Sequence, residues 1–298
     1  MFRPHRVALV LCLAGLVLAA PPAPARVIRT LPGGAGTVVS LPYNVQDSQG
    51  NQWMIYQGGY IQMQGGQPLY GQAGTLQING NGPNQRSNQA RLDDKTGEVV
   101  FDNMTSQGFT VTRRILIDKE NGYARYIDII KNTQGQDQTA AIQIQSNMNF
   151  GIDAGTTIED PRRKGNNIAW SASNGNGKAI FEMMAGKGSK VVPNFNFQQG
   201  NTYLQTNYSV PIPANKEVAL IHLHGVTASP EMAAQFVQQF KESKLLIGLP
   251  AELRKEVVNF ITGQGFIGER ELLRGDLFDV VEIRGGDQMR GTLKEPSY

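Results

Sequence analysis

Residues 60–64 read Tyr-Ile-Gln-Met-Gln, and residues 75–79 read Thr-Leu-Gln-Ile-Asn. In both stretches an apolar side chain alternates with an uncharged polar one, which is the period-two pattern of a strand with one buried and one exposed face. Glycine-rich reversals follow them, at Gly65-Gly66 and between Asn79 and Pro83. Glycine and asparagine supply the positive φ angles that tight turns need. The two stretches therefore predict antiparallel strands joined by short turns.

The same alternation recurs along most of the chain. It appears in residues 98–101, 109–117, 123–130, 140–145, 167–172, 178–184, 203–210 and 217–224. About a dozen short strands with Asn-Gly or Gly-rich breaks between them are typical of an all-β sandwich. The sequence shows no strand-helix-strand alternation, and no phosphate-binding glycine loop precedes a predicted helix. Both observations argue against a nucleotide-binding parallel sheet. The predicted fold is a large antiparallel β-sandwich, mainly β, with two short helices and a C-terminal β-hairpin.

Two amphipathic helices follow the strands. Ser229 is a predicted N-cap, with Pro230 at the first helical position and Glu231 in the first turn. A second helix is predicted from about Pro250 to Phe260. Helices this short do not fold alone, so we expect their apolar stripes to pack on the sandwich. The stripes consist of Met232, Phe236, Val237 and Phe240 in the first helix, and of Leu253, Val257 and Phe260 in the second.

Residues 1–25 have the features of a secretory signal peptide. Arg3 and Arg6 precede an apolar run from Val7 to Ala20, and the small residues at 23–25 fit a cleavage site. Cleavage would remove the two arginines and the single cysteine, and would lower the formal charge from +3 to +1. A nearly neutral exported chain without cysteine has no disulfide framework and lacks the basic field of a nucleic-acid-binding protein. We therefore predict a periplasmic or extracellular protein, with no nucleic-acid partner and no transmembrane segment after cleavage.

The predicted sandwich domain spans residues 26–227, and the two helices span 228–262. Residues 263–298 form a Gly-rich linker and a C-terminal hairpin that turns at Gly285-Gly286. An isolated two-stranded hairpin is marginally stable in water, so this one needs a partner surface. That surface belongs either to the same chain or to another one, and the sequence leaves both alternatives open.

Two regions resemble known families. The run Thr110-Val111-Thr112-Arg113-Arg114, with the later Asn121-Gly122-Tyr123-Ala124-Arg125-Tyr126, resembles an uncharacterised β-sandwich module of exported bacterial proteins. Residues 220–260 resemble the two-helix segment that follows this module, and the resemblance implies an exported sandwich without assigning chemistry. The terminal hairpin, with Gly286 and Gly291-Thr292-Leu293, resembles the first half of an Sm-like motif. The half that completes the RNA pocket in that family does not follow here, which favours a packing or docking hairpin.

His222 and His224 are the only histidines after the predicted signal peptide. They lie two residues apart on a predicted strand, so both project from one face, and paired neutral imidazoles can bind zinc or copper. Their neighbours Leu220, Ile221 and Leu223 indicate a strand buried on both sides. A structural role in the core is therefore the alternative to a metal site, and we expect no cofactor.

Trp53, Tyr56, Tyr60 and Tyr70 lie in a stretch between Arg29 and Arg86 in which Asp47 is the single charged residue. Aromatic rings among amides suit glycan contact, because a ring stacks on the apolar side of a sugar while amides bond its hydroxyls. The same residues also suit packing in a sheet. The segment Gly151–Asp160 offers several oxygens to Ca²⁺, but a solvated connection between strands explains it better.

The favoured function is an exported, non-enzymatic module that interacts with an envelope protein or a glycan. The alternative is a carbohydrate-active enzyme (a hydrolase, lyase or epimerase) built on the same sandwich. Glycoside chemistry needs two carboxylates at a set separation, and the sequence spacing selects no pair. The candidates are Asp93, Asp94, Asp102, Asp128, Asp153, Glu182 and Glu217.

Overall fold

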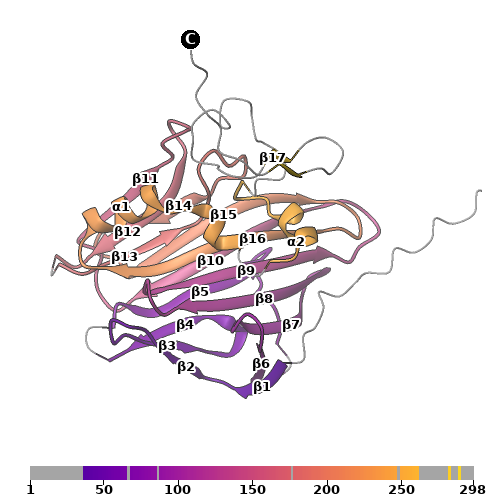
Figure 1. Ribbon diagram of the computed structural model, residues 1–298, viewed down its shortest axis with the longest axis horizontal. Helices are drawn as coiled ribbons and strands as arrows, with labels where there is room; N and C mark the ends of the chain where they lie inside the picture. The colour runs from indigo at the N-terminus through magenta and orange to yellow at the C-terminus, as the bar shows by residue number, and fades with distance from the viewer. Residues whose placement is uncertain are drawn as a thin grey trace, which may run out of the picture. The chain divides into compact units, whose positions relative to one another are not determined.

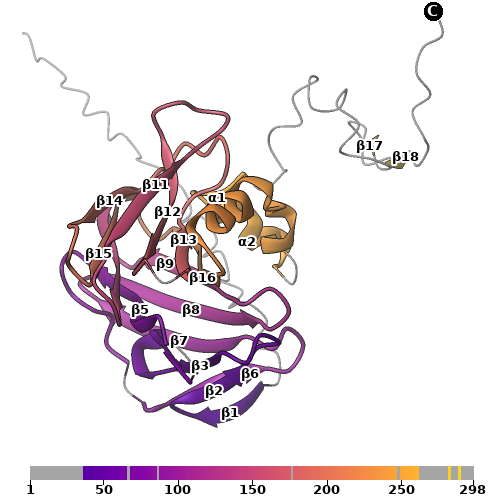
Figure 2. The ribbon, with the colours of Figure 1, turned by 90° about the vertical axis from the view of Figure 1, so that its left-hand side faces the viewer.

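The computed structural model describes residues 36–65, 68–85, 87–175, 177–246, 249–261, 281–282 and 288–289. The predicted signal peptide, the Gly-rich linker and the turn at Gly285-Gly286 lie outside these residues. Sixteen strands form one nine-stranded and one seven-stranded sheet, which lie face to face (Figures 1 and 2). Every pairing between these strands is antiparallel. The predicted antiparallel β-sandwich is confirmed.

The nine-stranded sheet has the order β1 (Gly36–Ser40), β6 (Gln89–Asp93), β7 (Val99–Ser106), β8 (Phe109–Asp118), β9 (Tyr123–Asn132), β16 (Glu217–Thr227), β13 (Ala179–Met183), β12 (Asn167–Ser173), β11 (Ala154–Glu159). The seven-stranded sheet has the order β14 (Asn194–Phe197), β15 (Tyr203–Ile212), β10 (Gln138–Met148), β5 (Tyr70–Ile78), β4 (Ile61–Gln64), β3 (Gln52–Ile55), β2 (Tyr43–Gln46). The strands β1 and β2 belong to different sheets, and the cis Leu41–Pro42 peptide lies between them.

The central strands of the nine-stranded sheet are buried on both faces. Along β16 every residue from Val218 to Val226 is buried. Leu220 and its alternate neighbours face the core between the sheets, whereas Ile221 and Leu223 point to the opposite side. The helices cover that opposite side (Figure 2). This double cover explains why β16 lacks the polar alternation of the outer strands.

Helix α1 (Pro230–Gln239) begins at the predicted N-cap, where the Ser229 hydroxyl accepts a hydrogen bond from the Met232 backbone N–H at 3.3 Å. It packs on the sheet through Phe236, whose ring centre lies 4.6 Å from that of Phe181. Met232 was expected in the same apolar stripe, but its side chain is 51% exposed. The buried stripe of α1 differs from the predicted one, because Ala233 and Val237 are buried where the helix packs on the sheet and Met232 is not.

The second helix is shorter than predicted. A 3₁₀ turn, η2 (Glu242–Leu246), precedes α2 (Ala251–Glu256), and the chain then becomes extended. Val257 forms a parallel bridge with Ala219 of β16 instead of another helical turn. Next to it the Asn259 side chain accepts a hydrogen bond from the Ile221 N–H at 2.9 Å and donates to the Ile221 carbonyl at 2.6 Å. This amide replaces a missing strand, because β13 pairs with β16 only as far as Leu223.

A buried ion cluster holds η2 on the outer side of the nine-stranded sheet. Glu98 accepts hydrogen bonds from Arg114 Nε at 2.8 Å and from Arg125 Nη2 at 2.5 Å. Arg125 Nη1 also donates to the Leu245 carbonyl at 3.0 Å, and Arg114 Nη2 donates to Asp93 at 3.1 Å. The charges are therefore paired and hydrogen-bonded, as buried charges must be.

The last described strands, β17 (Val281–Glu282) and β18 (Gln288–Met289), pair in the antiparallel sense, with Val281 opposite Met289. Within the residues described, no helix combines the length and the apolar character needed to cross a membrane.

Candidate functional site

The outer face of the seven-stranded sheet is covered by side-chain amides. None of its seven strands contains Asp, Glu, Lys, Arg or His, whereas the nine-stranded sheet contains all five. Because side chains alternate along a strand, the apolar residues point to the core and the amides point outward. We call this surface the amide face. Its Asn and Gln residues are Asn44, Gln46, Gln52, Gln62, Gln64, Gln72, Gln77, Gln143, Gln145, Asn147, Asn194, Asn196, Gln205 and Asn207.

The strand register aligns these amides in rows across the sheet. Gln143 of β10 lies opposite Gln77 on one side and Asn207 on the other. Its Nε2 donates to Asn207 Oδ1 at 2.8 Å, and Gln145 Nε2 donates to Gln143 Oε1. A side-chain amide carries two donors and an acceptor oxygen, so each keeps hydrogen-bonding capacity toward solvent. The rows form an ordered, uncharged surface of donors and acceptors.

Two tyrosines stand at one end of this face. Tyr56 and Tyr60 flank the 3₁₀ turn η1 (Gln57–Gly59) between β3 and β4, and we call residues 56–60 the tyrosine turn. The Tyr56 N–H donates to the Tyr60 carbonyl at 2.9 Å. Met54 and Gln62 are paired across β3 and β4 and point outward, and Tyr56 and Tyr60 lie two residues further toward the turn. Both tyrosines are therefore on the amide-face side, where they are half-buried. Their rings are parallel, with centres 5.1 Å apart. Burial, with a smaller effect of Tyr56, raises the pKa of Tyr60, so the Tyr60 hydroxyl stays protonated at neutral pH.

A buried arginine fixes this turn from inside the sandwich. Arg113 of β8 crosses the core, where its Nη1 donates to the carbonyls of Gly59 at 3.2 Å and Gly74 at 2.5 Å. Its Nε and Nη2 donate to the Asp128 carboxylate at 2.6 and 2.7 Å. Both side chains are fully buried. Burial alone would raise the pKa of Asp128, but the charge and hydrogen bonds of Arg113 outweigh it and hold this pKa well below its usual range.

The other two predicted glycan contacts lie in the core. The Trp53 side chain is fully buried and its Nε1 donates to Asp47 Oδ2 at 2.8 Å. Tyr70 is also fully buried, and its hydroxyl donates to the Phe181 carbonyl at 3.0 Å. The structure thus brings Tyr56 and Tyr60 together on the surface and separates Trp53 and Tyr70 from them.

The predicted metal-binding pair is part of the same buried polar chain. His222 Nε2 lies 3.1 Å from Asp128 Oδ2, and His222 Nδ1 lies 2.8 Å from His224 Nε2. His224 Nδ1 in turn lies 3.1 Å from Glu182 Oε1, within ion-pair distance but outside hydrogen-bond geometry. Neither imidazole has any exposed surface. A continuous series of buried polar side chains therefore connects Glu182, through both histidines, with Asp128, Arg113 and the tyrosine turn.

The protons along this chain follow from its contacts. Burial lowers the pKa of His222 to about 3 despite the hydrogen bond and charge of Asp128, so this imidazole is neutral at physiological pH. Its Nε2–H donates to Asp128, and its Nδ1 accepts from His224 Nε2–H. All four ring nitrogens face protein groups.

Among the described residues no group of three or more His, Cys, Asp and Glu side chains is placed to hold a metal ion. Metal binding by His222 and His224 stays a prediction, which metal analysis of the purified protein tests directly. A surface cleft lies between β6 and β7 and has Asp102 as its one carboxylate. A second hollow is lined by Tyr123, Phe236, Phe240 and two lysines.

Reasoning from sequence missed the role of Arg113 as a link between the sheets. The available signal was a charged residue on the inward-facing side of an apolar strand. Arg113 lies between Val111 and Ile115, and Asp128 lies between Tyr126 and Ile130, all of them buried. A buried charge needs a partner of opposite sign, so these two residues were candidates for pairing.

Comparison with known proteins gives the fold alone. No protein-family model matches the chain, and no curated protein matches its sequence. Heparan sulfate lyase HepC from Pedobacter heparinus is 8% identical, with 57% of this chain and 30% of the lyase covered at a TM-score of 0.42. A bacterial glucoamylase solved with acarbose is 8% identical, with 70% and 35% covered at 0.41. The heparinase III BT4657 gene product is 13% identical, with 67% and 37% covered at 0.40.

The chain thus spans about a third of the length of these three structures. The likeness is distant and concerns β-sandwich domains of carbohydrate-active enzymes.

Proposed function

We propose that this chain is an exported, non-enzymatic β-sandwich module that contacts neutral glycans of the cell envelope or cell surface. The observation that carries the proposal is the amide face, an uncharged outer sheet surface that ends in the stacked pair Tyr56–Tyr60.

The chemistry of this surface matches that of a neutral sugar. Sugar hydroxyls both donate and accept hydrogen bonds, and so do side-chain amides. The C–H side of a pyranose ring is apolar and stacks on a tyrosine ring, as the exposed parts of Tyr56 and Tyr60 allow. Polyanionic glycans would need cations, which the seven strands lack. A neutral glycan is therefore the favoured ligand.

Binding without catalysis is favoured by the positions of the acid and base groups. Asp128, Glu182, His222 and His224 are fully buried, out of reach of a substrate in this conformation. In the cleft between β6 and β7 the one carboxylate, Asp102, is engaged by Arg91 at 3.1 Å. Glycoside hydrolysis uses two carboxylates on either side of the scissile bond. The enzymatic alternative has no such pair in this cleft.

Export is part of the proposal and has its own test. Expression of the full chain in a Gram-negative host, followed by cell fractionation and N-terminal sequencing, should give a periplasmic or secreted product that starts near residue 26. A full-length product in the cytoplasm would contradict export.

The glycan proposal is tested with immobilised neutral polysaccharides and the purified mature chain. Removal of one ring, by Tyr56→Ala or Tyr60→Ala, should weaken binding about tenfold, whereas Tyr56→Phe and Tyr60→Phe should keep most of it. Gln62→Ala should weaken binding about threefold through one lost hydrogen bond. Gln136→Ala, at an exposed glutamine in the loop between β9 and β10, is the matched control.

Loss of binding in the Phe variants as well as the Ala variants would mean that ring stacking is not the contact. Equal binding by all variants, or no binding to any neutral polysaccharide, would refute the assignment of the amide face.

A protein partner is proposed for the C-terminal hairpin, which has too little core to be stable alone. Deletion of residues 264–298 should leave the sandwich folded and reduce association with envelope components. Unchanged pull-down and sedimentation behaviour would contradict this part of the proposal.

A further inference from the structure

The nine-stranded sheet has an opening between β6 and β7. These strands pair at Arg91–Val100 and Leu92–Val99, and the next pairing along this side of β7 is the Asn84–Thr105 bridge. Between these points β7 bulges from Phe101 to Met104, and Asn103 adopts the left-handed conformation at φ 54°. A cleft of about 530 Å³ lies here, within the usual range of small-molecule sites.

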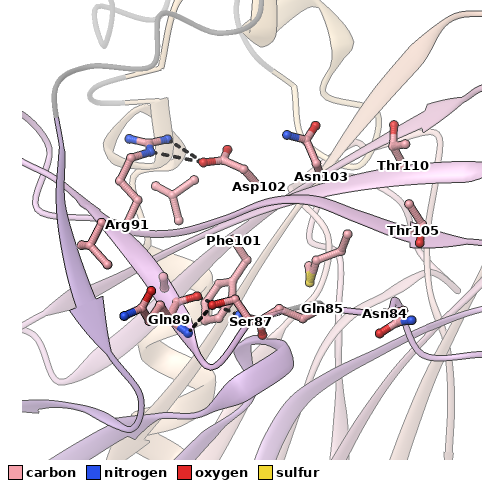
Figure 3. A pocket seen from close by; sticks show the side chains of 14 residues that line it. Asn84, Gln85, Ser87, Gln89, Arg91, Phe101, Asp102, Asn103, Thr105 and Thr110 are labelled. Atoms are coloured by element: carbon pink, nitrogen blue, oxygen red, sulfur yellow. Dashed lines mark hydrogen bonds and ion pairs between the residues drawn. The ribbon is translucent and has the colours of Figure 1, made fainter.

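The walls of this cleft carry uncharged polar groups. The polar side chains labelled in Figure 3 lie around Phe101. They include the amides of Asn84, Gln89 and Asn103. Phe101 and Met104 line the cleft but are each only 2% exposed, whereas Val38, which also lines it, is 64% exposed. An exposed apolar side chain among amides and hydroxyls suits a sugar ring, which has an apolar side and a hydroxylated rim.

The two charges of the cleft neutralise each other. Arg91 Nε and Nη2 lie 3.2 and 3.1 Å from Asp102 Oδ2 (Figure 3). The pair leaves no net charge to attract an acidic ligand. The other Asp102 oxygen can still accept a hydrogen bond from a ligand hydroxyl.

One side chain joins the cleft to the tyrosine turn. The Gly58 N–H of η1 donates to Gln85 Oε1 at 2.5 Å, and Gln85 Nε2 donates to the Gln89 carbonyl at 2.9 Å. The wall of the cleft and the turn that carries Tyr56 and Tyr60 are therefore held in a fixed relation.

We infer that this cleft is a second sugar subsite, which takes a single neutral pyranose unit. The inference rests on the proposed glycan function and adds to it a site on the other sheet. Short sugars should bind in the cleft without contacting the amide face, whereas long oligosaccharides should use both surfaces.

The test is isothermal titration calorimetry of the mature chain with maltose, cellobiose and chitobiose, and with digalacturonate as an acidic counterpart. At least one neutral disaccharide should bind, and digalacturonate should not. Asn103→Gly keeps the left-handed backbone and removes the amide, so it should weaken disaccharide binding about fivefold. Asn215→Gly is the matched control, because Asn215 is also exposed and left-handed, at φ 58°, in the loop after β15.

Thr105→Trp is the second variant. It places a large ring at an exposed position of the cleft and should weaken disaccharide binding at least twentyfold, while Tyr60→Ala should change it less than twofold. Thermal melting checks that each variant is folded.

Disaccharide binding that is insensitive to both Asn103→Gly and Thr105→Trp would overturn the cleft inference, and so would binding of digalacturonate alone. Polysaccharide binding lost in Tyr60→Ala but unaffected in Thr105→Trp would support the amide face as a glycan site and refute the cleft. Disaccharide binding lost in Thr105→Trp, with polysaccharide binding unaffected in Tyr60→Ala, would support the cleft and refute the amide face. No binding of any sugar would overturn both.

Discussion

Arg113→Met should destabilise the sandwich more than any exposed ion-pair variant. Arg113 is fully buried, bonds both oxygens of Asp128, and donates to the carbonyls of Gly59 and Gly74. Methionine replaces the aliphatic part of the side chain but has no donor. The variant therefore leaves a buried carboxylate without its cation and two carbonyls without a donor.

The expected loss follows from these contacts. Breaking a buried ion pair by removing one partner costs about 3–5 kcal/mol, and each buried carbonyl left without a partner adds about 1–3 kcal/mol. Since these costs overlap, we expect at least about 5 kcal/mol, a large part of the roughly 5–15 kcal/mol by which domains are stable. With a urea dependence of about 2 kcal/mol per molar, the unfolding midpoint should fall by about 2 M or more.

Urea unfolding followed by tryptophan fluorescence measures this change. Arg91→Met is the control, because it breaks the partly exposed Arg91–Asp102 pair and should cost less than about 1 kcal/mol. The double variant Arg113→Met/Asp128→Leu removes both buried charges and should recover at least half of the loss. A cost for Arg113→Met below about 1.5 kcal/mol would refute the role assigned to this pair.

Three further predictions concern other contacts of the fold. Asn259→Leu should lower the free energy of unfolding in urea by about 2–4 kcal/mol, because the buried N–H and carbonyl of Ile221 lose their partner. Hydrogen exchange of the Ile221 amide should become faster, and an unchanged urea midpoint would refute this prediction. The pKa of His222 is lowered from 6.5 to about 3 by burial, so the unfolded chain binds a proton between these pH values that the folded chain does not. The contribution of neutral His222 to the free energy of unfolding is therefore complete above pH 6.5, and it falls by up to about 1.4 kcal/mol for each pH unit below 6.5. In His222→Gln the urea midpoint of unfolding should depend less on pH between 6.5 and 4.5. An equal slope in both proteins would contradict this. Ser229→Ala removes the N-cap of α1 and should cost about 1 kcal/mol, whereas Ser229→Asp should not.

The strands with one buried face could be predicted from the sequence. Residues 61–64 and 75–78 alternate because the core lies on one side and water on the other, so the period survives in the residue types. The edge strand β11 does not show this signal. Of its six residues only Ile158 is buried, and the segment was interpreted as part of a connecting loop. Its pairing with β12 depends on a neighbouring strand, which no local pattern reports.

The length of α2 could not be predicted for a related reason. Leu253, Val257 and Phe260 recur at helical spacing, and all three are buried. The chain nevertheless leaves the helix at Val257, because Val257 and Asn259 bond to the edge that β13 leaves open on β16. Tertiary hydrogen bonding outweighed the helical period here.

Half of the candidate site was visible in the sequence. The charge-poor stretch that holds Tyr56 and Tyr60 indicated an amide-rich surface, and these two residues form its stacked pair. The contributions of β10, β14 and β15 come from the distant segments 138–148, 194–197 and 203–212, and only the sheet order places them beside β5. The chain of polar groups from Glu182 to Arg113 likewise depends on cross-strand register.

The most direct test of the central claim is a ¹H–¹⁵N spectrum of the mature chain during titration with a neutral oligosaccharide, read at the side-chain NH₂ resonances of Asn and Gln. The account predicts that the largest shifts belong to amides of the seven-stranded sheet, with Gln62, Gln64 and Gln52 near the tyrosine turn among them. Shifts that gather around Phe236 and Phe240, or a spectrum that does not change at saturating sugar, would contradict it.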